Sequence, residues 1–91
     1  MKRVVEEFLI GDPLGIHARP AAAAALAIRK SGARVTVRFG TSSADAASIV
    51  QMLGLGAGPQ ARITVEIEGE DDAIEAARAA VVEHLCAERQ D

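Results

Sequence analysis

The residues best suited to chemistry are a histidine and an arginine two positions apart in the segment Gly15-Ile16-His17-Ala18-Arg19-Pro20. A neutral imidazole such as that of His17 can attack an electrophile and carry a group covalently. The planar, permanently charged guanidinium of Arg19 matches the oxygens of a phosphate. The pair therefore indicates phosphoryl transfer or phosphate binding.

The residues after His17 predict the element that positions this pair. Proline is favoured in the first turn of a helix, and alanine, which fills residues 21–25, is the best helix former. We expect a helix over residues 18–30, ended by Gly32. The unpaired N–H groups of Ala18 and Arg19 would then form an anion site at the positive end of the helix dipole. That positive end favours the neutral, nucleophilic imidazole.

Composition limits the alternatives. Ninety-one residues make one domain over 1–91, with 49% hydrophobic residues but only 2% aromatic ones, so we expect an aliphatic core. The net charge of −3, without a basic tract or aromatic stacking platforms, argues against nucleic-acid binding. No signal peptide or membrane-length apolar run is present, and the single cysteine, Cys86, has no internal disulfide partner. These features predict a soluble, cytoplasmic protein.

The periodicity of apolar residues predicts an α+β fold with element order β-α-β-β-α-β-α. Several helices would cover one face of a small antiparallel sheet, although a ferredoxin-like arrangement fits the same pattern. The strand at 42–46 has weak propensity and is expected at a sheet edge, after a type II′ turn at Gly40-Thr41. Asp72 and Glu75 form a candidate capping box. The expected strands are 4–10, 34–39, 42–46 and 62–68, and the expected helices are 18–30, 49–53 and 72–88.

Two segments together resemble a known family. The sequence Gly-Ile-His-Ala-Arg-Pro-Ala, starting at Gly15, and the segment from Ala47 to Gly56 are similar to HPr, the histidine-containing phosphocarrier of the bacterial phosphotransferase system. The resemblance extends from about Val5 to Leu85. It implies an HPr-like open-faced β-sandwich, with a four-stranded antiparallel sheet and three helices on one face.

The resemblance also implies a function. Enzyme I, charged by phosphoenolpyruvate, would pass a phosphoryl group to Nδ1 of His17, and Arg19 would stabilise it. His17 would then pass the group to an enzyme IIA-type acceptor, for example in sugar transport. Such a chain is a phosphoryl-transfer intermediate that carries phosphohistidine, not a stand-alone catalyst. It needs no cofactor and no metal, and it should act as a monomer because both partners must reach one exposed histidine.

Ser48 has two interpretations. Serine is an ordinary N-cap for the short helix that follows it. The resemblance adds a regulatory interpretation, in which an HPr kinase phosphorylates Ser48. However, Ala47 stands where relatives with that regulation often carry lysine.

A short helix cannot bury all of its apolar residues, so some of Ile49, Val50 and Leu53 should be exposed near His17. A small exposed apolar patch is typical of a docking surface. The resemblance implies that partners dock on these residues and on Arg29, although a basic residue in the last turn of a helix also complements the helix dipole.

Three other functions would use some of the same residues. A regulatory docking module of the same fold, acting without group transfer, would lack the histidine. A phosphate-binding module would use His17 and Arg19 without reacting. A metal site has too few ligands, because His84 and Cys86 diverge around a helix.

The sequence leaves the branch of the family open. Leu14 and Ala47 favour the nitrogen-regulatory branch, whereas Gly54 and Gly56 favour the sugar branch. Gln60 stands where the family usually has glycine, so that loop is expected to turn differently.

Overall fold

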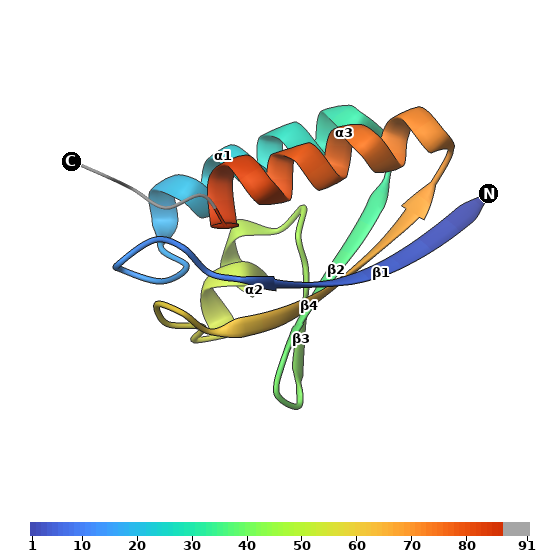
Figure 1. Ribbon diagram of the computed structural model, residues 1–91. Coiled ribbons are helices and arrows are strands. Elements are labelled where there is room, and N and C mark those ends of the chain that lie inside the picture. The colour runs from blue at the N-terminus through green and yellow to red at the C-terminus, as the bar shows by residue number, and fades with distance from the viewer. Residues whose placement is uncertain (87–91) are drawn as a thin grey trace.

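The computed structural model describes residues 1–86 of the chain. It contains four strands, three α-helices and a short π-helical segment, η1 (Figure 1). In chain order they are β1 (Lys2–Leu9), α1 (Ala18–Ser31), β2 (Arg34–Phe39), β3 (Ser42–Asp45), α2 (Ile49–Gly54), β4 (Arg62–Gly69), α3 (Asp71–Val81) and η1 (Val82–Cys86).

The four strands form one sheet in the order β1-β4-β2-β3, and every adjacent pair is antiparallel. A ferredoxin-like sheet is also antiparallel between neighbours but has its first and third strands at the centre, whereas β4 and β2 are central here, so the strand order excludes it. Helices α1 and α3 lie side by side over one face of the sheet, and α2 packs against α1 and β3 (Figure 1). The expected α+β open-faced sandwich is therefore confirmed, as is the edge position of β3.

The core lies between the sheet and the helices and is aliphatic, as expected. Alternate residues of β4, namely Ile63, Val65 and Ile67, are completely buried. Helix α1 covers them with small side chains, which let its backbone approach the sheet, and α3 contributes a second buried stripe. The buried residues of these two helices are Pro20, Ala21, Ala24, Ala25, Ile28, Ile74, Ala77, Ala80 and Val81.

For most elements, the boundaries predicted from local sequence signals lie within two residues of those in the structure. Gly32 ends α1 in the left-handed conformation, with φ of 82°. In the hairpin between β2 and β3, Gly40 has φ of 61° whereas Thr41 is not left-handed, as the type II′ turn requires. The end expected for the last helix, at residue 88, lies outside the described residues.

The predicted capping box is wrong. The N-cap of α3 is Glu70, because β4 continues to Gly69 and the helix begins almost at once. Asp72 is thus inside the first turn, where its Oδ1 accepts from the N–H of Ala73 over 2.9 Å. Its negative charge near the helix start is still favourable, since it meets the positive end of the dipole.

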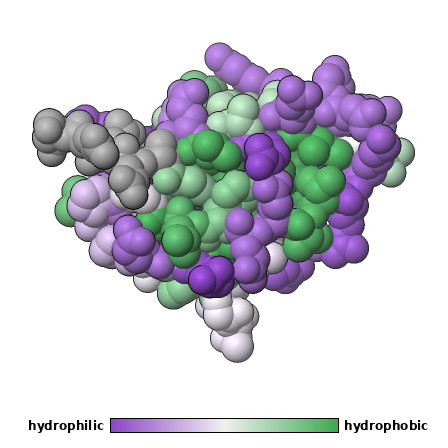
Figure 2. Space-filling view, in the orientation of Figure 1, coloured by the Kyte–Doolittle hydropathy of each residue, from purple (hydrophilic) through white to green (hydrophobic). Residues whose placement is uncertain are grey.

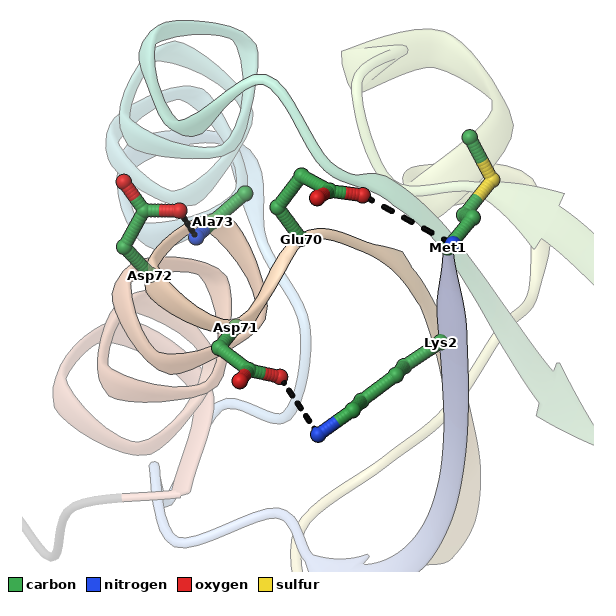
Figure 3. Close-up of polar contacts among 6 residues, drawn as sticks. All are labelled: Met1, Lys2, Glu70, Asp71, Asp72 and Ala73. Carbon is green, nitrogen blue, oxygen red and sulfur yellow. Dashed lines mark hydrogen bonds and ion pairs between the residues drawn. The ribbon is translucent and has the colours of Figure 1, made fainter.

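Ion pairs join the start of β1 to the start of α3 (Figure 3). The amino group of Met1 lies 3.7 Å from Glu70, and Nζ of Lys2 lies 3.0 Å from Asp71. These residues and Asp72 line a hollow of about 400 Å³. The pairs are well exposed, so each contributes little stability. This hollow is at the opposite end of β1 from the loop that carries His17.

The face that carries β1 and α3 is mixed in polarity, with apolar residues between hydrophilic ones (Figure 2). Val5 and Leu9 of β1 are exposed. Glu6 of β1 forms a bidentate ion pair with Arg78 of α3, with N···O distances of 2.7 and 2.8 Å. The Arg78 guanidinium also lies over the ring of Phe8. This contact links the edge of the sheet to the helix above it.

Candidate functional site

The site is built on the loop between β1 and α1, which lies beside the start of α1 (Figure 1). Asp12 shapes this loop. Its backbone carbonyl accepts from Gly15 over 2.9 Å, and its Oδ1 accepts from the N–H of Leu14 over 2.9 Å. An aspartate that accepts from the backbone two residues later forms an Asx turn. The side chain of Asp12 therefore organises the turn that leads to His17.

Gly15 allows this loop to pack against the loop that follows α2. Its φ is 73°, and an added Cβ would lie 2.6 Å from the carbonyl oxygen of Ala57 and 2.7 Å from Cα of Gly58. The next residue, Ile16, donates its N–H to the same Ala57 oxygen over 3.0 Å. Only glycine fits a left-handed position with such close backbone contact.

His17 is the N-cap of α1, with φ of −129° and ψ of 177°, but its side chain does not cap the helix. The imidazole instead places Nε2 3.0 Å from Oδ2 of Asp12. The His17 side chain is 34% exposed, whereas Asp12 is 7% exposed as a whole residue. The Nε2 side of the ring thus contacts a buried carboxylate, while the ring stays partly exposed to solvent.

The contact with Asp12 decides which ring nitrogen carries the proton. A carboxylate only accepts hydrogen bonds, so Nε2 must donate. In the neutral imidazole, Nδ1 then keeps its lone pair. Within residues 1–86, Nδ1 has no hydrogen-bond partner. The nitrogen able to act as a nucleophile is therefore Nδ1.

The start of α1 leaves two backbone N–H groups without an acceptor among residues 1–86. The first intrahelical bond runs from Ala21 to the carbonyl of His17. The backbone N–H groups of Ala18 and Arg19 have no acceptor within the described chain. The Arg19 side chain is exposed and forms no ion pair within residues 1–86, so its guanidinium can turn toward a group on His17.

Ser48 has the structural role that its residue type predicts. It is the N-cap of α2, and its Oγ accepts from the N–H of Gln51 over 3.2 Å. Asp45 lies close by, since its backbone carbonyl accepts from the N–H of Ser48 over 2.9 Å. Ser48 is half-buried at a helix start.

The predicted docking residues differ in exposure. Val50 is 79% exposed and Leu53 is 40% exposed, whereas Ile49 is half-buried against the core. The Nε of Arg29 donates to the carbonyl of Ala47 over 2.9 Å, so this side chain also ties the end of α1 to the start of α2.

Sequence reasoning missed two residues of this region. Asp12 was assigned no role from the sequence, although it lies five residues before the histidine and contacts it. Leu14 was used only to compare branches of the family, yet it is a large apolar side chain that is mostly exposed three residues before His17.

A family model described as the PTS HPr component phosphorylation site matches residues 4–85. This covers most of the chain and includes both segments of the site. The chain belongs to the HPr family. It has the phosphocarrier function of that family in the phosphotransferase system.

Known relatives agree with this family. A phosphocarrier protein HPr of Lysinibacillus sphaericus is 34% identical over 67 residues, which cover 74% of this chain and 76% of the relative. A multiphosphoryl transfer protein of Xanthomonas campestris is 45% identical over 65 residues, or 71% of this chain, but the match spans only 8% of that relative.

The fold agrees as well. The crystal structure of a phosphocarrier protein HPr from Bacillus anthracis superposes with a TM-score of 0.81 at 25% identity, covering 91% of this chain and 96% of the other. No helix within residues 1–86 is long and apolar enough to cross a membrane. The same residues contain no cluster of three or more side chains that would hold a metal ion.

Proposed function

We propose that His17 is the residue that carries the phosphoryl group, with enzyme I as donor and an enzyme IIA-type protein as acceptor. The observation that carries this proposal is the geometry of His17. Its imidazole stands at the start of α1, partly exposed, with Nε2 3.0 Å from Asp12. Nδ1 is free to react beside the unpaired N–H groups of the helix start.

The roles of the neighbouring groups follow from charge. A phosphoryl group on Nδ1 brings negative oxygens to the helix start. The amides of Ala18 and Arg19 and the Arg19 guanidinium are the donors available to them. Transfer of a phosphoryl group depends on in-line positioning and charge stabilisation, and both reacting partners must reach the same ring. An exposed ring is therefore a requirement of the proposal.

Docking and location complete the proposal. Partners would contact the exposed residues of α2, Val50 and Leu53, with Ile49 behind them and Arg29 at the edge. The complexes would be transient, with the chain as a monomer. We propose the cytoplasm as the location, because phosphoenolpyruvate, which supplies the phosphoryl group to enzyme I, is a cytoplasmic metabolite.

Regulation by an HPr kinase at Ser48 is a further proposal, and a Ser48→Ala variant that resists the kinase would support it.

The deciding experiment is a phosphotransfer assay with purified enzyme I, Mg²⁺ and phosphoenolpyruvate. Intact mass should show one acid-labile phosphoryl group on the wild type and none on His17→Gln, with His84→Gln as the matched control that still accepts it. A folded wild-type protein that takes no phosphate would contradict the proposal. If it instead bound inorganic phosphate with similar affinity in both His17 forms, the phosphate-binding alternative would be favoured.

A further inference from the structure

Asp12 is the single buried charged residue among residues 1–86. Burying a carboxylate costs free energy unless it is hydrogen-bonded or paired. Here each oxygen has its own partner. Oδ1 accepts from the N–H of Leu14, and Oδ2 faces Nε2 of His17, with distances of 2.9 and 3.0 Å.

We propose that Asp12 is a positioning residue for phosphoryl transfer, which holds His17 with the proton on Nε2 and offsets the positive charge that the ring gains when Nδ1 is phosphorylated. This inference rests on the proposed function of His17. The Asx turn fixes the carboxylate through Oδ1, so Oδ2 has a fixed place from which to orient the ring.

The transfer step balances with this proton in place. The Nδ1 lone pair of His17 forms a bond to phosphorus, while the bond from phosphorus to the donor atom of enzyme I breaks and its electron pair returns to that atom. Nε2 keeps its proton throughout, so the phosphorylated His17 ring is an imidazolium beside the Asp12 carboxylate. When the acceptor attacks phosphorus, the bonding pair returns to Nδ1 and the ring is neutral again. No proton leaves the ring at either step.

The two oxygens of Asp12 make the isosteric variant Asp12→Asn a sharp test. The N–H of Leu14 requires an oxygen at the Oδ1 position, so the amide NH₂ would face Nε2 of His17. Two donors cannot bond to each other, so Nε2 must become the acceptor and the proton must move to Nδ1. Asp12→Asn should therefore keep the turn and the fold while it blocks the nucleophilic nitrogen.

The experiment combines ¹⁵N–¹H long-range correlation spectra of the imidazole rings with the phosphotransfer rate. His17→Gln assigns the signals, since the chain has two histidines. In the wild type, the neutral His17 ring should be the Nε2–H form. In Asp12→Asn it should be mainly the Nδ1–H form. Asp12→Ala should give a mixture of both forms.

Transfer from enzyme I should slow by about 10–100-fold in Asp12→Ala, the loss typical when a group that orients a functional histidine is removed, and at least as much in Asp12→Asn. The matched control is Asp45→Asn, because Asp45 forms the same kind of turn with the N–H of Ala47 but contacts no histidine. This control should keep the wild-type rate and tautomer.

The outcomes separate this inference from the proposed function. An Nδ1–H ring in the wild type would overturn the inference, even if an Asp12 variant failed to fold. So would an Asp12→Asn protein with an unchanged tautomer or an undiminished rate. If the wild type accepted no phosphoryl group at His17, the proposed function would fail, whereas the spectra would still report whether Asp12 positions the ring.

Discussion

The N–H of Ile16 donates a hydrogen bond of 3.0 Å to the carbonyl oxygen of Ala57. This bond joins the loop that ends at His17 to the loop that follows α2, the helix with the exposed residues Val50 and Leu53. The proposed reactive residue and the proposed docking helix are therefore held together by the main chain. A partner that docks on α2 meets His17 at a position set by backbone and not by a flexible side chain.

Gly15→Ala should disturb this junction. The left-handed φ of 73° alone costs an alanine about 1–2 kcal/mol. The added methyl group would also collide with the backbone of Ala57 and Gly58. We expect a loss of at least about 2 kcal/mol in the free energy of unfolding, measured by urea denaturation. Gly40→Ala is the matched control, because its φ is 61° but nothing lies within 4 Å of its new Cβ. An equal loss of unfolding free energy in both variants would show that the backbone around Ala57 and Gly58 shifts to accommodate the new methyl group.

Arg19→Ala should slow phosphotransfer without affecting stability. Its side chain is exposed and forms no ion pair within the described chain. One charge-assisted hydrogen bond to the transferring group contributes about 1.5–3 kcal/mol, which corresponds to a rate loss of roughly 10–100-fold. Arg19→Lys should recover part of the rate, since lysine restores the positive charge but cannot bind two phosphate oxygens with a planar guanidinium. Arg62→Ala, on the outer face of the sheet, should retain the wild-type rate; a similar loss there would point to a general effect of charge.

Val50→Lys should weaken docking while the fold stays intact. Val50 is 79% exposed, so a lysine is accommodated, but an apolar contact with the partner would be lost. We expect a higher apparent KM for the chain as substrate of enzyme I, with unchanged urea denaturation. Val5→Lys is the matched control, since Val5 is 55% exposed on β1. Equal kinetics in the two variants would exclude the α2 surface as the docking site.

Gln60→Gly should stabilise the protein. Gln60 is the one non-glycine residue with positive φ among residues 1–86, at 66°. Relief of this strain is worth about 1–2 kcal/mol, and the greater chain entropy of glycine offsets about 0.5–1 kcal/mol of it. The expected net gain is about 0.5–1 kcal/mol in urea denaturation. Gln60→Ala keeps the strained conformation and should show no such gain; if it did, side-chain contacts of Gln60 would be responsible.

Glu6 should make stability depend on pH in the acid range. Its hydrogen bonds with Arg78 lower the pKa of this carboxyl below its ordinary value of 4.5. A lowered pKa in the folded state means that the stabilisation is complete above the unfolded value and is lost as the pH falls through the folded value. The stability gap between wild type and Glu6→Gln should thus be constant above about pH 5.5 and close below pH 4.5. The gap should be small and should shrink with salt, because the pair is partly exposed. If the stability difference between wild type and Glu6→Gln persisted at low pH, the packing of the Glu6 side chain and not its charge would be responsible.

The sequence by itself was sufficient for the parts that depend on local rules. Apolar periodicity, the proline and alanine run after His17, and the turn and cap residues together located all four strands and three helices. The capping behaviour of Gly32 and Ser48 followed from backbone conformation and hydrogen-bonding capacity, which are properties of neighbouring residues. The hexapeptide around His17 and its likeness to HPr indicated the family correctly. The N-cap of α3 was predicted wrongly at Asp72, because Glu70, Asp71 and Asp72 are all acceptable near a helix start and only the length of β4 chooses among them.

Tertiary structure decided what depends on distance through space. Whether the sheet was ferredoxin-like or HPr-like depended on which strands pair, and non-local pairing is not encoded in periodicity. The contact of Asp12 with Nε2 of His17 depends on how the loop between β1 and α1 folds back, so residue spacing alone did not predict it. The division of α2 into buried Met52 and exposed Val50 depended on where α1 and β3 lie against it. The strand pairing and the division of α2 arise from packing between segments that are distant in the chain, and the loop that carries Asp12 and His17 is bonded to the distant Ala57.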